Sequence, residues 1–375
     1  MVDIASPDPG ETAARAAETA RTVARAVTDL AQGPPWAAAL MRTGEDEHVL
    51  CLAIHHICAD YWSIGLVVNE ILDRYDHLAR SAAYERPAPP VSFAEVARWE
   101  AGPEQSARRE SQLGYWTRHY EHPPRALDLP ADLPRPALPT FTGGSVPVRL
   151  GRSLSDALDG LAREHSATAF MVLLAGYALL LHELTGQRDL AVGSYVAGRP
   201  RREFESVVGL FARALPFRVD LDGDPTGAEL IGRIREECLA AYDNQDVSVD
   251  AIVRGLRLER EADRNPLFQT MFVLETAPAA MPGAQGLEVS VETPELGTAK
   301  FDLTLVLFPG DEGYAGFLEY SADLFHEATI ARAARRLESA LARLADRPRA
   351  RLSELAPVVR TRPLDPSNTE RRTHG

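Results

Sequence analysis

Short apolar runs alternate with longer amphipathic stretches along most of the chain. A run from Val49 to Ile54 has the length of a buried strand and ends in a polar loop. Beyond that loop, apolar residues recur at helical spacing from Ile64 to Leu72, and Ser63 is placed to cap this helix. The stretch from Thr168 to Leu184 is almost entirely apolar, which predicts a buried helix.

The same patterns predict further elements in both halves of the chain. Helices are predicted at 11–30, 153–165 and 327–346, with another helical region that carries Trp99 and Tyr115-Trp116. Strands are predicted at 37–42, 146–150, 190–196, 214–220, 267–275, 286–293, 301–308 and 314–321. The mixed order of strands and helices indicates an α/β chain of two sandwiched lobes.

Proline and polar residues suggest where these lobes begin and end. Four prolines lie between Leu127 and Thr142, which is typical of a linker. We therefore predict an N-terminal lobe at 1–135 and a C-terminal lobe at 136–356. The polar residues 357–375 predict a disordered tail.

Composition excludes several classes of function. The chain has 375 residues, 45% of them hydrophobic, and a formal net charge of −14, which disfavours a nucleic-acid surface and a polybasic membrane patch. The three cysteines match no zinc spacing, so we expect no metal site and a reduced, cytoplasmic setting. The N-terminus lacks the basic start and apolar run of a signal peptide.

Candidate chemistry is concentrated where the strand at 49–54 opens into a loop. His55 and His56 are adjacent there, and neighbouring strand residues point to opposite faces, so the two imidazoles converge poorly on one metal ion. A histidine suits proton transfer near neutral pH. Asp60 is close enough in sequence to orient an imidazole or an arginine. The alternative is that both histidines are structural and hydrogen-bonded.

Eight segments, in order along the chain, resemble the condensation domain family of nonribosomal peptide synthetases. His55 to Asp60 is similar to the family's HHxxxD signature. The other segments that resemble family motifs lie at 93–99, 129–136, 192–199, 208–218, 244–247, 265–269 and 300–303. Agreement in all eight makes the resemblance specific over residues 30–350.

The resemblance implies two chloramphenicol-acetyltransferase-like lobes in a V, with a tunnel between them. Donor and acceptor carrier proteins would deliver their substrates into that tunnel on phosphopantetheine arms. The implied activity is that of an acyltransferase, which joins an acyl or peptidyl thioester to an amine or hydroxyl. The chain itself would be a monomer that binds no cofactor.

The resemblance also implies roles for individual residues. His56 would take the proton from the attacking amine or position it, and His55 would be structural. Asp60 would pair with Arg199 and hold the shape of the motif. The residues implied to line the tunnel are Tyr61, Trp62, Ser63, Arg213 and Gln269.

Three departures from the family pattern leave alternatives open. Family motifs that precede the equivalent of Glu11 are absent, so the first lobe is expected to be incomplete. Tyr61 replaces a glycine that can adopt positive φ and leave room for substrate. Arg213 replaces an asparagine, and it either binds an acidic or phosphate-bearing group or is a solvated surface residue. The alternative function is a non-catalytic platform that recruits a carrier or a tailoring enzyme; epimerisation is a weaker alternative.

Overall fold

The computed structural model describes residues 2–6, 8–27, 29–81, 83–85, 88–259, 261–275, 286–291 and 297–358. The chain forms two compact units, each built from separate stretches. The first unit comprises Met1–Gln112, Tyr195–Arg213 and Thr276–Leu296, and the second comprises Leu113–Ser194, Ala214–Glu275 and Gly297–Gly375. The lobe boundary expected at residue 135 stays a prediction. The expected disordered tail lies, from residue 359 onward, outside the described residues.

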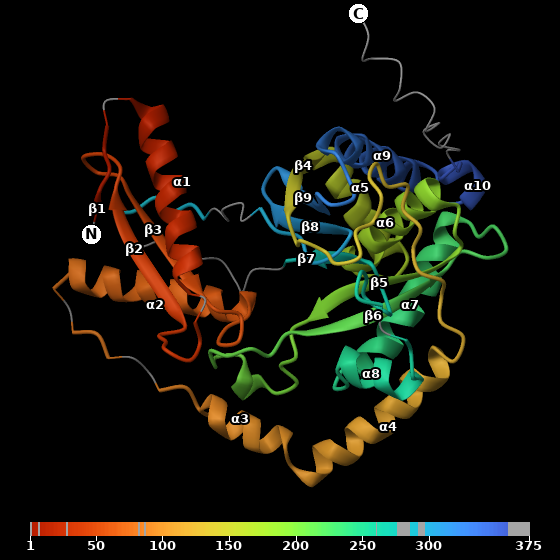
Figure 1. Cartoon of the computed structure of the whole chain (residues 1–375), viewed down its shortest axis with the longest axis horizontal. Coiled ribbons are helices and arrows are strands. Elements are labelled where there is room, and N and C mark those ends of the chain that lie inside the picture. The colour runs from red at the N-terminus through yellow and green to blue at the C-terminus, as the bar shows by residue number, and fades with distance from the viewer. Residues whose placement is uncertain are drawn as a thin grey trace, which may run out of the picture. The chain divides into compact units, whose positions relative to one another are not determined.

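The first unit contains a three-stranded sheet in the order β1-β2-β3. β1 (Val2–Asp3) runs parallel to β2 (Trp36–Arg42), which pairs antiparallel with β3 (His48–Ile54). Helix α1 (Pro9–Ala26) packs against β2 and β3, and Figure 1 shows it lying along these strands.

Helices α2 (Tyr61–Ala79) and α3 (Phe93–Glu100) also belong to the first unit. Ser92 caps α3 in a capping box with Glu95, which satisfies two backbone donors at the helix start. A small core joins α3 to the segment 195–213, and its buried members are Val96, Phe204, Val207 and Phe211. Helix α4 (Pro103–His119) begins in the first unit and ends in the second.

The second unit is built on a six-stranded sheet in the order β4-β9-β8-β7-β5-β6. β8 lies antiparallel to β9 and parallel to β7, so the sheet is mixed. Its strands are β4 (Gly143–Gly151), β5 (Asp189–Val196), β6 (Arg213–Asp220), β7 (Thr270–Leu274), β8 (Leu303–Gly310) and β9 (Gly313–Ser321).

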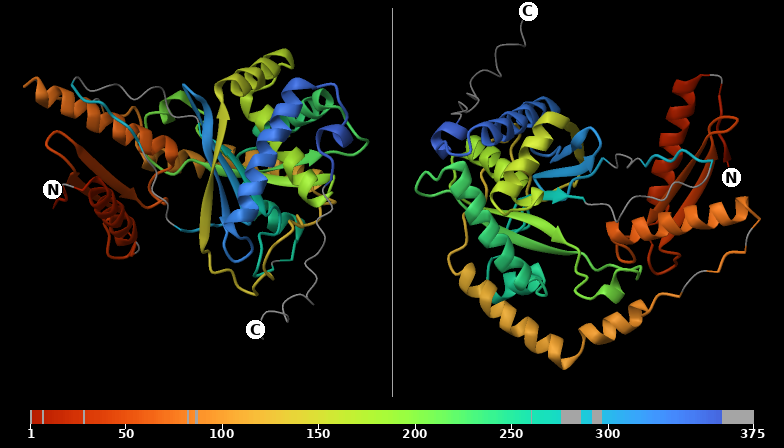
Figure 2. Two further views of the ribbon diagram at one scale, coloured as in Figure 1. Left: turned by 90° about the horizontal axis from the view of Figure 1, so that it is seen from above. Right: turned by 180° about the vertical axis from the view of Figure 1, so that it is seen from behind.

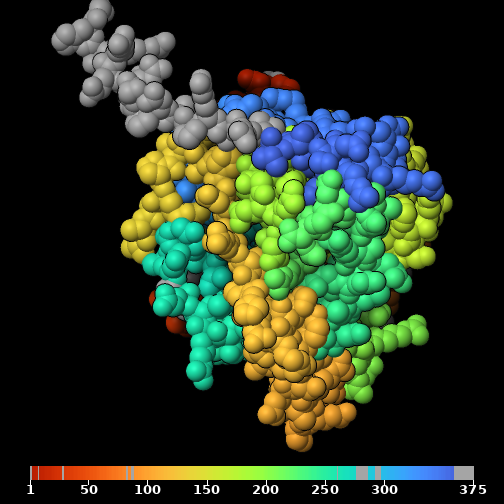
Figure 3. Space-filling view, turned by 90° about the vertical axis from the view of Figure 1, so that its right-hand side faces the viewer, coloured from red at the N-terminus to blue at the C-terminus, as the bar shows by residue number. Residues whose placement is uncertain are grey.

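Helices α5 (Arg152–Glu164), α6 (Ala169–Thr185) and α9 (Glu327–Asp346) pack together against this sheet (Figures 1 and 2). α6 is apolar on all sides and buried, as its sequence predicts. α9 buries a single stripe at i, i+3 and i+4 spacing and exposes its polar face. α10 (Leu352–Leu355) and the end of α9 lie beside the start of α7 (Gly227–Asp243), as Figure 3 shows.

Most predicted elements are present with small shifts of their ends, which confirms the mixed α/β class. The strand predicted at 286–293 is absent over 286–291, and its last two residues lie outside the described part of the chain. Neither α7 nor α8 (Val249–Leu256) was predicted, although Thr226 and Glu229 form a capping box that marks the start of α7. The proline-rich segment predicted as a linker packs within the second unit, where Leu127 and Leu129 are buried.

Within the described residues, no single helix is both long and apolar enough to cross a membrane. α5 and α6 meet that criterion only as a pair, and they are bent by 111° where they meet.

Candidate active site

The loop between β3 and α2 holds His56 with a defined tautomer. The His56 side chain is exposed, and its Nδ1 lies 2.7 Å from the carbonyl oxygen of Ala59. A carbonyl oxygen only accepts hydrogen bonds, so Nδ1 carries the proton. In the neutral imidazole, Nε2 then keeps its lone pair and can accept a proton.

His55 has the other tautomer. Its Nδ1 accepts a hydrogen bond from the Ile57 backbone N–H at 3.1 Å, so the neutral ring carries its proton on Nε2. A turn closes the loop where the Cys58 N–H donates to the His55 carbonyl at 2.9 Å. Adjacent histidines thus have different partners and different tautomers. The expectation that they do not share a task stays a prediction.

Asp60 ends the loop and caps α2. Its Oδ1 accepts from the Ser63 N–H at 2.8 Å and the Ser63 hydroxyl at 2.7 Å. Its Oδ2 accepts from the backbone N–H groups of Phe211 and Ala212 at 3.0 and 3.1 Å. Arg199 completes the shell with an ion pair to Oδ1 at 3.1 Å, the pairing that the resemblance implied. The cap of α2 is therefore Asp60, and the prediction that Ser63 caps this helix is wrong.

Arg199 is buried with its partner. The side chains of Arg199 and Asp60 are only 2% and 3% exposed. Nη1 of Arg199 donates to the carbonyl oxygens of Phe204 at 2.5 Å and Val207 at 2.7 Å, and the guanidinium lies 3.9 Å from the centre of the Phe211 ring. This geometry gives the buried cation an opposite charge, backbone acceptors and an aromatic face, while its Nε is buried without an acceptor.

Gly198 permits the close approach of the two chain segments. Its φ is +63°, and a Cβ at this position would lie 2.0 Å from the Phe211 carbonyl oxygen. Only glycine fits such a conformation without strain or displacement of the neighbouring backbone.

The surroundings of Asp60 hold its carboxyl group ionised. Burial acts to raise its pKa, but the hydrogen bonds from Ser63 and Phe211 and the charge of Arg199 together lower the pKa below its ordinary value. Burial lowers the pKa of Arg199, although a guanidinium remains charged at neutral pH. The pair is therefore ionic.

The structure corrects the role expected of Ser63, whereas the roles of Tyr61 and Trp62 in lining a tunnel stay predictions. Ser63 is fully buried in the hydrogen-bond network around Asp60, so it does not line an open channel. Tyr61 is the first residue of α2, and its φ is not positive, so the backbone at this position does not require a glycine. Its side chain is 38% exposed. Trp62 donates from Nε1 to the Glu205 carbonyl at 2.8 Å, which ties α2 to the segment 195–213.

Arg213 has an acidic partner, and its role in lining a tunnel stays a prediction. It forms an ion pair with Glu100 of α3, and both side chains are partly buried. The Glu100 carboxylate therefore neutralises much of the charge that would attract an acidic or phosphate-bearing group.

The remaining predicted residue, Gln269, lies in the second unit. Its Oε1 accepts from the Leu127 N–H at 2.6 Å, and its Nε2 donates to the Asn265 carbonyl at 2.8 Å. Both ends of the amide are thus engaged with backbone, and only 5% of the residue is exposed. Its role in lining a tunnel stays a prediction.

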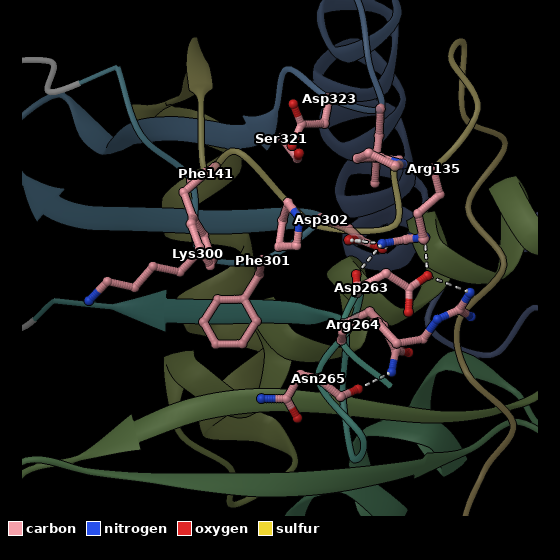
Figure 4. A pocket seen from close by; sticks show the side chains of 16 residues that line it. Arg135, Phe141, Asp263, Arg264, Asn265, Lys300, Phe301, Asp302, Ser321 and Asp323 are labelled. Carbon is pink, nitrogen blue, oxygen red and sulfur yellow. Dashed lines mark hydrogen bonds and ion pairs between the residues drawn. The ribbon is translucent and has the colours of Figure 1, made fainter. Parts of the chain in front are cut away.

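Three of the family-like segments meet around a pocket of about 250 Å³ in the second unit. Figure 4 shows Arg135 directed toward Asp302, and Lys300 and Phe301 on the opposite side near Phe141. Nη1 of Arg135 donates to Oδ1 of Asp302 at 3.0 Å. This bond attaches the proline-rich segment to the start of β8, so these motifs stabilise the second unit.

In the described ranges, no group of three or more His, Cys, Asp or Glu side chains is placed to hold a metal ion. The sequence motifs did not reveal the backbone N–H groups of Gly209, Phe211 and Ala212, which donate hydrogen bonds to Ser63 and Asp60. Their segment resembles a family motif, but a motif does not show which backbone groups turn toward Asp60.

Comparison with known proteins agrees with this fold. The family model for the condensation domain matches residues 2–361. The chain is 37% identical over 334 residues to a linear gramicidin synthase polypeptide of Brevibacillus parabrevis, covering 88% of this chain and 6% of that protein. The X-domain from teicoplanin biosynthesis is 28% identical with a TM-score of 0.81, covering 94% of this chain and 80% of that one. The X-domain in a complex with OxyB from teicoplanin biosynthesis is 29% identical with a TM-score of 0.76. The match covers 89% of this chain and 75% of that one.

The chain therefore belongs to the condensation domain family, and its curated relatives are nonribosomal peptide synthetases. It spans only 6% of the length of the gramicidin synthase polypeptide to which it is similar.

Proposed function

We propose that this domain is an acyltransferase that condenses two carrier-bound substrates. The amine or hydroxyl of the acceptor attacks the carbonyl carbon of the donor thioester. His56 Nε2 accepts the proton of the attacking group, the C–S bond breaks, and the proton ends on the released thiol. The products are an amide or ester on the acceptor carrier and a free phosphopantetheine thiol on the donor carrier.

The observation that carries this proposal is the hydrogen bond from His56 Nδ1 to the Ala59 carbonyl. It directs the basic nitrogen of an exposed imidazole away from the backbone, as a general base requires. A base of this kind contributes about 10²–10⁴-fold to a rate. Delivery of both thioesters by carrier proteins would add the benefit of proximity.

The test compares the parent chain with His56→Ala and a matched histidine variant. Each protein is mixed with a donor-loaded and an acceptor-loaded carrier, or with thioester mimics, and the product is measured by mass spectrometry. We expect His56→Ala to reduce product formation by about a hundredfold or more.

His77→Ala is the control, because His77 is also exposed and also bonds a carbonyl through Nδ1, that of Asp73 at 2.8 Å. It should retain the parental rate. Equal rates for the parent and His56→Ala would reject the role of His56.

A second function is favoured by one observation, the similarity to an X-domain that was solved in complex with OxyB. A platform of this kind would bind a partner protein without forming product. A folded parent chain that binds a carrier or a tailoring enzyme but forms no product would support it. The intact His55, His56 and Asp60 favour the enzyme.

A further inference from the structure

We infer that Ser63 is a positioning residue that sets the tautomer of His56 through the backbone of Gly209. This inference concerns how the site works and rests on the proposed role of His56. Ser63 cannot contact a substrate in this structure, because it is fully buried. Any effect on the reaction must therefore pass through other groups.

The first step is the peptide group between Ala59 and Asp60. Its carbonyl oxygen accepts the proton of His56 Nδ1 at 2.7 Å. Its N–H lies in the same plane, points in the opposite direction, and donates to the Gly209 carbonyl at 3.3 Å. A peptide group is planar, so whatever fixes its N–H also fixes the direction of its carbonyl. Gly209 thereby determines where the partner of His56 points.

The second step is the attachment of Gly209 to Ser63. The Ser63 Oγ accepts from the Gly209 N–H at 3.0 Å and lies 2.8 Å from the Gly209 carbonyl oxygen. It also accepts from Arg199 at 3.0 Å. The hydroxyl proton of Ser63 is shared between the Gly209 carbonyl and Asp60 Oδ1, and the lone pairs of its oxygen accept from Arg199 and the Gly209 N–H. Ser63 thus contacts both polar backbone groups of Gly209.

Capping does not explain this arrangement, because Asp60 already caps α2 and needs only the Ser63 N–H for that purpose. Removing the hydroxyl leaves the cap in place but frees Gly209 to shift. The peptide at 59–60 then rotates, and the bond that selects the Nδ1–H form of His56 weakens. The chain of bonds is therefore Ser63, Gly209, the Ala59–Asp60 peptide and His56.

The test measures the His56 tautomer directly by ¹⁵N NMR of the neutral ring, in the parent and in Ser63→Ala. We expect the parent to show one protonated Nδ1 and one bare Nε2. Ser63→Ala should lower the ratio of the Nδ1–H to the Nε2–H tautomer by about fivefold, since a hydrogen bond of ordinary net strength corresponds to about that factor. Unchanged ¹⁵N shifts would overturn the inference. Because this readout needs no turnover, it remains decisive even if the chain forms no product.

Ser155→Ala is the matched control in the second unit. Its hydroxyl is also buried and joins two backbone groups, donating to the Leu150 carbonyl at 2.9 Å and accepting from the Tyr314 N–H at 3.0 Å. It should leave the His56 spectrum unchanged. A change equal to that of Ser63→Ala would assign the effect to general loosening and overturn the inference.

Kinetics give a second readout if the domain is active. Ser63→Ala should lower kcat in proportion to the lost fraction of the Nδ1–H tautomer, with little change in KM, because the substrate contacts remain in place. If Ser63→Ala does not fold, Ser63→Cys keeps a group of similar size with a weak donor and undergoes the same NMR measurement. A parental tautomer ratio in folded Ser63→Cys, in which the strong hydroxyl bonds are lost, would count against the inference.

Discussion

Replacing Arg199 by methionine should destabilise the first unit by about 3–5 kcal/mol, the cost of removing one partner of a buried ion pair. Methionine fills a similar space but leaves Asp60 without its counter-charge. It also leaves the carbonyl groups of Phe204 and Val207 without their donor. The pair is almost completely buried, so solvent screening does not reduce this cost.

Hydrogen exchange followed by mass spectrometry measures the effect where it arises. Peptides that cover residues 55–66 and 198–213 report on the two segments that Arg199 joins. A loss of about 3 kcal/mol corresponds to roughly a hundredfold faster exchange, since each 1.4 kcal/mol is about tenfold. Peptides from α6 in the second unit should be unaffected.

Arg152→Met is the matched control for this experiment. Arg152 and Asp156 form an i,i+4 ion pair at 2.9 Å, but their side chains are 63% and 59% exposed. Loss of such a pair should produce no measurable change. Equal exchange in the Arg199 and Arg152 variants would refute the argument that burial makes the Arg199 pair important.

Three further predictions follow from other contacts. Acid should lower the free energy of unfolding of the parent more than that of Asp60→Asn. The pKa of Asp60 is lowered in the folded state, so its ionisation stabilises the fold above the ordinary pKa of about 3.9, and this contribution is lost as pH falls through the folded-state pKa. Unfolding free energies measured between about pH 5 and 2 will show the difference. Gly198→Ala should destabilise the fold by more than about 1–2 kcal/mol because of the positive φ at this position. Gly232→Ala in α7 should stabilise the fold by up to about 1 kcal/mol, because the added Cβ meets no neighbouring side chain or segment within 4 Å. Denaturant titrations measure both changes. Gln269→Leu should cost about 1–3 kcal/mol, because it leaves the Leu127 N–H and a second backbone group unpaired, and an unchanged urea midpoint would contradict this.

Local pattern was sufficient to predict most of the elements and the position of the histidine motif. α6 and α9 were predicted because the distribution of their apolar residues follows the helical period. The strand predicted at 286–293 was wrong over 286–291, since alternating apolar residues show only that a strand is possible and not that a partner strand is present. α7 was missed although its capping box is visible in the sequence.

The sequence motifs, in their order along the chain, were sufficient to predict the family. The resemblance to that family then predicted His56 as the candidate base and the pairing of Asp60 with Arg199. The packed chain was needed to show that Ser63 is buried rather than lining a channel, that Arg213 is paired with Glu100, and which backbone groups surround Asp60. The physical reason is that a motif specifies side chains, whereas these features depend on backbone N–H and C=O groups, which every residue except proline carries alike. Where those groups point is settled only when segments far apart in sequence, such as those of Ser63 and Gly209, pack against each other.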